Sequence, residues 1–141
     1  MYQLDHIHIE VEDRLKAAAW FEDLLGLSPD PKLLSWADDP MGPLILSSSD
    51  GHTCLSLFAR GCAKASRDAT IAFRTSGQNF LDFTARLDTL SLVDDRDGSL
   101  LTSKSLVDHQ LSWSIYFSDL DGNRFEITTY DYGLVRDALT T

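Results

Sequence analysis

The sequence predicts an α+β fold built from two similar halves, each with the element order strand, helix and three strands. Hydrophobic residues alternate with period two where strands are expected, and two longer segments carry them at helical spacing. This order of segments repeats after about 65 residues, and neither half can bury its sheet alone. We therefore expect one domain over residues 1–141, with halves at about 1–60 and 69–132 and a C-terminal tail.

The first half begins with a strand over Leu4–Glu12. Its apolar side chains lie on one side, and the polar residues on the other side are His6, His8 and Glu10. Asp13 has the character of a helix N-cap and Gly26 that of a residue that ends a helix, so a helix is expected between them. Three strands should follow, at Leu33–Ala37, Leu44–Ser48 and His52–Arg60.

The second half repeats this order. A strand over Ala69–Thr75 precedes a helix over about Gly77–Leu90, and a weaker strand is expected within Leu92–Leu106. The last two strands, Leu111–Phe117 and Asn123–Tyr130, flank an Asp-Gly pair, which is a strong hairpin signal.

Glu126 stands out in the last strand, because period-two alternation places this carboxylate where another packing side chain is expected. Superposing the two halves makes Thr70 the counterpart of His6, and Ser56 the counterpart of Glu126. In two related halves these four positions would face one centre. The alternative for Glu126 is a solvated strand position, paired with Arg124 or Arg74.

The composition excludes some classes of partner. A net charge of −10 is unfavourable for binding nucleic acid or an anionic membrane. The sequence has no apolar run long enough to span a membrane and no signal-peptide pattern, so a cytoplasmic location is expected.

Three segments resemble the vicinal oxygen chelate superfamily, which includes glyoxalase I, extradiol dioxygenases, fosfomycin-modifying enzymes and bleomycin-binding proteins. They are D-H-I-H-I-E-V-E-D-R-L-K-A-A-A-W-F-E-D-L-L-G-L, D-G-H-T-C-L-S-L-F and S-D-L-D-G-N-R-F-E, and the resemblance covers nearly the whole chain. It implies the glyoxalase/bleomycin resistance/dioxygenase fold, in which paired βαβββ modules form a curved, partly open eight-stranded sheet around a concave cavity.

The resemblance also implies a divalent metal ion, such as Fe²⁺, Mn²⁺, Zn²⁺ or Ni²⁺, with His6 and Glu126 as ligands. The other usual ligand positions carry Ser56 and Thr70, which are poor substitutes for a carboxylate and an imidazole, so the site is expected to be incomplete. Further side chains expected to line the cavity are His8, Glu10 and His52.

A narrower resemblance runs through the closing hairpin. The residues Val107-x-His109, Ile115-Tyr116, Asp119, Gly122 and Glu126 follow the extradiol dioxygenase signature, with Leu120 where that signature has proline. It implies that His109 and Tyr116 act near the substrate in proton transfer or positioning, which suits an imidazole that titrates near neutral pH.

Two functions remain open from the sequence. The first is a small metal-dependent enzyme, dioxygenase-like or glyoxalase-like, that acts on a small molecule with vicinal oxygens. The second is a non-catalytic protein of the same fold that binds a small molecule or drug, as the bleomycin-resistance proteins do. In either case a homodimer is expected, because each half leaves open sheet edges, and the cavity could be built within one chain or between two.

Overall fold

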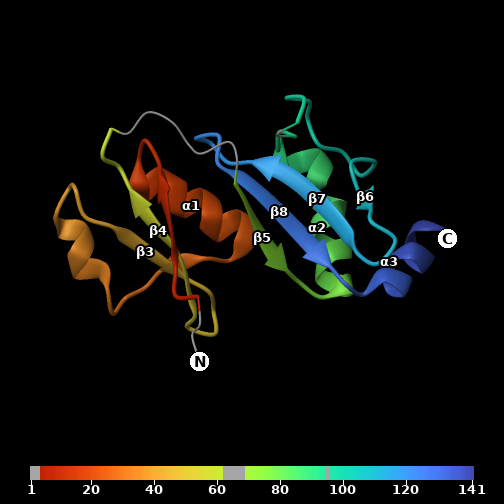
Figure 1. The fold of residues 1–141 in the computed structure, drawn as a ribbon, viewed down its shortest axis with the longest axis horizontal. Coiled ribbons are helices and arrows are strands. Elements are labelled where there is room, and N and C mark those ends of the chain that lie inside the picture. Colours follow the sequence, from red (N-terminus) through yellow and green to blue (C-terminus); the bar gives the residue numbers. More distant parts are fainter. Residues whose placement is uncertain (1–3, 62–68, 95) are drawn as a thin grey trace. The chain divides into compact units, whose positions relative to one another are not determined.

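The structure is a computed structural model that describes residues 4–61, 69–94 and 96–141 (Figure 1). The chain divides into two compact units, Met1–Ala65 and Ser66–Thr141, and each is described by itself. Within the described ranges, no helix is both long enough and apolar enough to cross a membrane.

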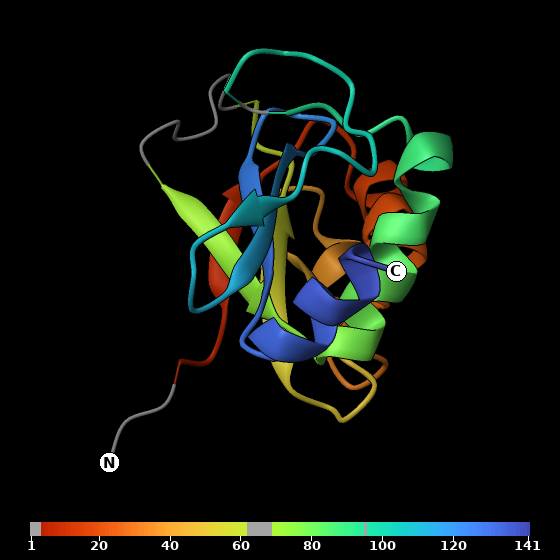
Figure 2. The same ribbon diagram turned by 90° about the vertical axis from the view of Figure 1, so that its right-hand side faces the viewer.

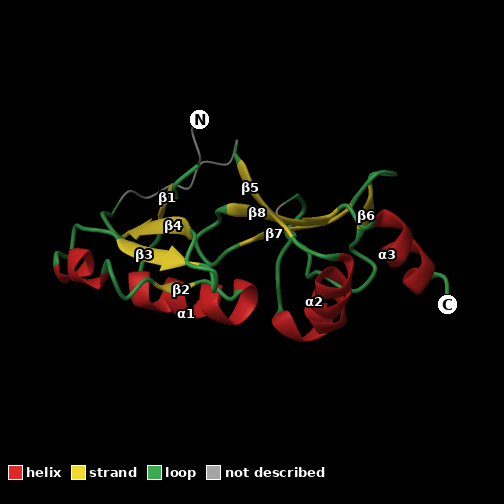
Figure 3. Ribbon diagram, turned by 90° about the horizontal axis from the view of Figure 1, so that it is seen from below, coloured by secondary structure: helices red, strands yellow, loops and turns green. Residues whose placement is uncertain are grey.

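Unit 1 is a four-stranded sheet with one long helix. Its elements are β1 (Ile7–Glu10), α1 (Arg14–Leu25), β2 (Ser28–Pro29), the 3₁₀ helix η1 (Leu34–Asp38), β3 (Leu44–Ser47) and β4 (Thr53–Phe58). The strand order is β1-β4-β3-β2, with β1 and β4 parallel and the other pairs antiparallel. Helix α1 lies along one face of this sheet (Figure 3).

Unit 2 repeats this plan and adds a helix at its end. Its elements are β5 (Thr70–Arg74), α2 (Gly77–Leu90), β6 (Val107–Asp108), β7 (Trp113–Ser118), β8 (Arg124–Thr129) and α3 (Tyr132–Leu139). The strand order is β5-β8-β7-β6, again with only the first pair parallel. Figure 2 shows α2 and α3 side by side at the same face of this sheet.

The two sheets share not only their strand order but also their register. In unit 1, Ile7 lies opposite Leu55 in the parallel pair, and in unit 2, Ile71 lies opposite Phe125. These are the residues that the superposition of the two halves made equivalent. The predicted α+β fold with βαβββ modules is therefore confirmed.

The two long helices begin and end where local chemistry predicts. The carboxylate of Asp13 accepts hydrogen bonds from the backbone N–H groups of Leu15 and Lys16, both at 3.0 Å, and so caps α1. Gly26 ends α1 with a φ of 69°, which a residue with a side chain rarely adopts. Helix α2 spans Gly77–Leu90, as the sequence predicts.

The strand expected at Leu33–Ala37 is wrong, because η1 occupies this segment. Arg14 at the start of α1 explains the difference. Its guanidinium donates to the carbonyl groups of Ala37, Asp39 and Gly42 at 3.0, 3.2 and 2.7 Å, which requires the chain to curl around one side chain. Two residues of the same loop, Trp36 and Met41, remain exposed.

Two segments of unit 2 also differ from expectation. Most of Leu92–Leu106 is irregular, and its only sheet contacts within the described part of the chain are single bridges from Val93 to Leu100 and Ser118. The expected tail contains α3, whose Val135 is fully buried.

Candidate functional site

The polar site of unit 2 lies on the sheet face opposite α2. Phe83 of α2 packs against Phe117 of β7 with ring centroids 6.2 Å apart, so the apolar side of β7 and β8 faces the helix. Alternation then places a polar set on the other side, and its members are Ser114, Tyr116, Glu126 and Thr128. Glu126 therefore lies among polar side chains, on the face that α2 does not cover.

Glu126 is held by its neighbours across the β7-β8 ladder. Its direct partner is Tyr116, while the hydroxyl of Ser114, one step further along β7, donates to its Oε1 atom at 2.7 Å. The Ser114 hydroxyl also lies 3.1 Å from the hydroxyl of Thr128, which in turn donates to the carbonyl of Trp113. The carboxylate of Glu126 therefore has a fixed orientation.

His109 reaches Tyr116 from the loop between β6 and β7. Its Nε2 atom lies 3.0 Å from the Tyr116 hydroxyl, so the two groups are hydrogen-bonded. The loop is tight: Gln110 has a φ of 69°, and its N–H donates to the carboxylate of Asp108 at 2.7 Å. The hydroxyl of Tyr132 donates to the same carboxylate at 3.0 Å, which fixes the strand that precedes His109.

The surroundings keep Tyr116 protonated at neutral pH. Burial of the hydroxyl raises the pKa of Tyr116 above its ordinary value of 10.0, and the negative charge of Glu126 raises it further. The Ser114 hydroxyl and the positive charge of Arg96 act in the opposite direction and lower this pKa. Tyr116 is thus a neutral hydrogen-bonding group with the negative charge of Glu126 and the positive charge of Arg96 nearby.

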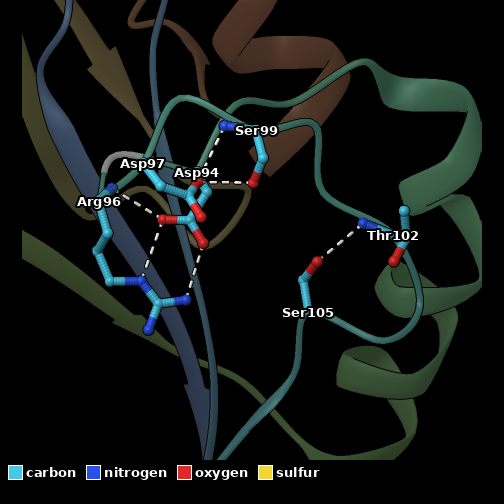
Figure 4. Close-up of polar contacts among 6 residues, drawn as sticks. All are labelled: Asp94, Arg96, Asp97, Ser99, Thr102 and Ser105. Carbon is cyan, nitrogen blue, oxygen red and sulfur yellow. Dashed lines mark hydrogen bonds and ion pairs between the residues drawn. The ribbon is translucent and has the colours of Figure 1, made fainter.

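Arg96 lies over the ring of Tyr116, with its Cζ atom 5.6 Å from the ring centroid. The carboxylate of Asp94 binds the Arg96 side chain through two hydrogen bonds of 3.0 and 2.8 Å, and Figure 4 shows the two groups face to face. Asp94 is buried, although it belongs to an irregular segment. Sequence reasoning missed both residues, because it treated their segment as a polar loop.

The polar face of unit 1 is organised differently. Nε2 of His8 lies 2.7 Å from Oε1 of Glu10, and the His8 ring lies 4.1 Å from that of Phe58. Ser56 is the register partner of His8 and is buried. Three of the residues expected to line a cavity, His8, Glu10 and Ser56, are therefore neighbours on one face of one sheet.

The remaining predicted residues lie at strand ends. His6 precedes β1, and its Nδ1 atom is 2.6 Å from the carboxylate of Asp5. His52 is exposed next to the turn before β4, 4.0 Å from Asp50. Thr70 opens β5 on the same face as Glu126, whose own partner on that strand is Ala72.

The described residues supply few groups that could bind a metal ion together. Among residues 4–61, 69–94 and 96–141, no three His, Cys, Asp or Glu side chains come together in a way that could hold a metal. Near Glu126, the partners are the hydroxyl groups of Ser114 and Tyr116, which are weak ligands for a divalent ion. Among the described residues of unit 2, Glu126 therefore lacks a second strong ligand beside it.

Unit 2 also has an open surface pocket of about 440 Å³ that the sequence did not indicate. It is lined by Arg74, Thr75, Ser76, Tyr130 and Asp131, at the start of α2 and α3. Asp131 already accepts a hydrogen bond of 2.6 Å from the Gly77 N–H, the first of α2. This pocket lies at the end of the sheet where β5 and β8 finish.

Comparison with known proteins gave matches in structure only. No family model matches the sequence, and no curated protein sequence matches it. The oxidase ChaP-H2 superposes with a TM-score of 0.68 at 23% identity, over 94% of this chain and 96% of that one. A glyoxalase/dioxygenase from Nostoc punctiforme gives 0.62 at 18% identity, over 91% and 90%.

A third similar structure contains ligands. It is a variant of the fosfomycin resistance protein FosX from Listeria monocytogenes, in complex with manganese(II) and 1S,2S-dihydroxypropylphosphonic acid. Its TM-score is 0.67 at 16% identity, over 95% of this chain and 96% of that one. These matches extend over both βαβββ units, and together they show that this chain has the vicinal oxygen chelate fold.

Proposed function

We propose that this protein is a small-molecule enzyme that binds a compound with two adjacent oxygens on the polar face of β7 and β8. The observation that carries this proposal is the hydrogen bond of 3.0 Å between His109 and Tyr116, next to the carboxylate of Glu126. An imidazole, a phenol and a carboxylate on one face are the groups that general acid–base chemistry requires.

Each group has a distinct part in the proposed reaction. Nε2 of His109 would accept a proton from a hydroxyl group of the bound compound, since an imidazole can change its charge near neutral pH. Tyr116 stays protonated because its pKa is raised, so its O–H can donate to the second oxygen. The charge of Glu126 would disfavour an anionic ligand, so we expect a neutral or weakly acidic substrate.

We also propose that Glu126 of unit 2 is a ligand of a weakly bound divalent ion, and that His6 of unit 1 is a metal-binding histidine. Two contacts support this. Asp5 binds Nδ1 of His6, as carboxylates commonly do for metal-binding histidines, and Ser114 binds only one oxygen of Glu126. The similar FosX variant was determined with manganese(II). A single carboxylate does not complete a metal centre, and the proposed proton transfer needs only the residues of unit 2.

A binding protein without turnover is the second candidate, and two residues favour it. Ser56 and Thr70 occupy the positions where a catalytic metal would need stronger ligands, and Ser56 is buried, with a relative exposure of 1%. Such a protein would use the same polar face to bind a hydroxylated compound and release it unchanged.

Binding of catechol, which has two adjacent hydroxyl groups, tests the proposal against phenol, which has one. Saturation-transfer NMR should show stronger binding of catechol by the parent protein, and weaker binding by Tyr116→Phe and His109→Ala. His52→Ala is the matched control, because His52 is an exposed histidine of unit 1. Equal binding of catechol and phenol would contradict the proposal, and binding without oxygen uptake or product would favour the second candidate.

A further inference from the structure

Helix α3 reaches the loop that carries His109 through the side chain of Tyr132, its first residue. The Tyr132 hydroxyl donates to Oδ2 of Asp108, the last residue of β6, at 3.0 Å. This hydrogen bond is the main reason why the pKa of Tyr132 is raised above its ordinary value of 10.0, so the phenol stays protonated and remains the donor at neutral pH. A contact from the C-terminal helix therefore ends on the residue directly before His109 (Figure 1).

Two neighbours hold the ring of Tyr132 in place. The ring stacks on the indole of Trp113, with centroids 5.5 Å apart and an angle of 14° between the planes. Trp113 is the register partner of Asp108 in the β6-β7 pair, and its indole N–H donates to the Tyr132 carbonyl at 3.3 Å. Neither contact involves the Tyr132 hydroxyl. Tyr132→Phe would therefore keep both of them and remove only the hydrogen bond to Asp108.

Asp108 connects this contact to the loop between β6 and β7. Its Oδ1 atom accepts from the N–H of Gln110 at 2.7 Å, and the N–H of His109 donates to the carbonyl of Ser112 at 2.9 Å, which closes the loop. One carboxylate thus binds α3 through one oxygen and the loop through the other. Because the His109 side chain is exposed, the loop rather than surrounding packing sets its position.

We propose that Tyr132 is a positioning residue of the candidate site, which holds Nε2 of His109 against the Tyr116 hydroxyl by fixing Asp108. Tyr132 acts only through these residues and does not touch the bound compound. Among the described residues, unit 1 has no helix that corresponds to α3, which fits a role specific to the site of unit 2. The inference deepens the proposed function and rests on it for the part that His109 plays.

NMR of the His109 imidazole tests this role without any substrate. The chain has four histidines, so His109→Ala identifies the His109 signals in protein with ¹⁵N-labelled histidine. At about pH 8, where an ordinary imidazole is neutral, the parent should show a nuclear Overhauser effect between the rings of His109 and Tyr116, whose centroids are 6.1 Å apart. Tyr132→Phe should shift the equilibrium toward a released loop by about fivefold, the effect of one hydrogen bond. The Overhauser effect should weaken, and the Nε2 chemical shift should move toward that of a free imidazole.

A double-mutant cycle shows whether Tyr132 acts through Asp108. Asp108→Ala should change the His109 signals in the same direction, and adding Tyr132→Phe to it should change nothing further. Tyr130→Phe is the matched control, because it removes an exposed tyrosine hydroxyl two residues before α3. Arg136→Gln is a second control. It removes the guanidinium that lies 5.9 Å from the Tyr132 ring centroid but leaves the hydroxyl, so the His109 signals should stay as in the parent.

Three results would overturn the positioning role. They are unchanged His109 signals in Tyr132→Phe, an equal change in Tyr130→Phe, and a further change when Tyr132→Phe is added to Asp108→Ala. Far-UV circular dichroism shows that each variant is folded. The proposed function would fail separately, through catechol binding that does not depend on His109, and that outcome would leave the effect of Tyr132 on the His109 signals in place.

Discussion

The hydroxyl of Ser114 lies 2.7 Å from Oε1 of Glu126, although the two residues are diagonal rather than direct partners across β7 and β8. The direct partner of Glu126 is Tyr116, whose hydroxyl lies 3.0 Å from Nε2 of His109 and also interacts with Ser114 and Glu126. The Ser114 hydroxyl is therefore common to the carboxylate and the phenol. The negative charge of Glu126 raises the pKa of Tyr116, so the phenol keeps its proton beside the charged carboxylate.

Metal binding should depend on Glu126 and improve with a histidine at position 70. We expect weak binding of Mn²⁺, Fe²⁺, Zn²⁺ or Ni²⁺ by the parent protein and none by Glu126→Gln. Thr70 lies on the same face as Glu126, so Thr70→His should strengthen binding by about tenfold or more, which is about 1.4 kcal/mol. Affinity should fall in acid, because a ligating imidazole must be neutral.

Calorimetric titration of the three proteins with each ion measures these affinities. Thr75→His serves as the control, since it adds an imidazole just after the far end of β5, at the surface pocket. A parent protein that binds no ion, together with a folded Thr70→His that gains nothing, would contradict the assignment of His6 and Glu126 as ligands.

Two aspartates of unit 2 should affect acid stability in opposite directions. The hydrogen bond to Arg96 holds the pKa of Asp94 below its ordinary value of 3.8, so Asp94 contributes stability above pH 3.8 that is lost as pH falls through its folded pKa. Burial raises the pKa of Asp119 above 3.8. Its contribution is therefore present below pH 3.8 and is lost as pH rises through its folded pKa.

Urea unfolding at a series of acidic pH values tests this contrast. Asp94→Asn should reduce the loss of unfolding free energy on acidification, while Asp119→Asn should increase it. Asp88→Asn, at an exposed position of α2, controls for the removal of one charge. Equal slopes in all three variants would mean that neither shift contributes to stability.

Two glycines in first helical turns should respond to alanine with opposite signs. A Cβ atom on Gly77 would lie 2.8 Å from Cβ of Asp131 and 3.0 Å from Cδ2 of Leu134, so Gly77→Ala should destabilise unit 2 by about 1–3 kcal/mol. On Gly133, the nearest atom is the mobile end of Arg136 at 3.7 Å. Gly133→Ala should stabilise α3 by up to about 1 kcal/mol. The midpoints of denaturant unfolding compare the stabilities of the two variants. If Gly133→Ala were destabilised as well, the prediction for α3 would be wrong.

Self-association is expected from the sheet edges. In the described residues, β1 pairs only with β4 and β5 only with β8, so each sheet has an edge strand with unused backbone groups. We expect a twofold-symmetric homodimer with about twice the chain mass of 15.7 kDa. Light scattering at micromolar concentration measures this mass, and a monomer at that concentration would contradict the prediction.

Periodicity predicts those parts of the site that lie on regular strands. Glu126 was singled out by alternation and Tyr116 by the resemblance to the extradiol dioxygenase signature, and both lie on the strands that alternation predicts. Arg96 and Asp94 could not be found in this way. Their position depends on the bridge between Val93 and Ser118, and an irregular segment carries no periodic signal that would reveal such a bridge.

The two other differences from expectation have local causes. The segment Leu33–Ala37 is rich in apolar residues, which favours a strand, but Arg14 binds three carbonyl groups around it and η1 forms instead. Helix α3 spans only Tyr132–Leu139, and its one buried residue, Val135, gives too short a pattern to identify from sequence.

Asp131 begins α3, yet its side chain caps a different helix. Its Oδ2 atom accepts from the first N–H of α2, at Gly77, and α3 has no side-chain cap of its own. Undocking residues 131–141 would therefore expose the start of α2, which lies 54 positions earlier in the sequence than Asp131. Hydrogen exchange in the first turn of α2 should thus follow the opening of the C-terminus, so these distant segments form one cooperative unit.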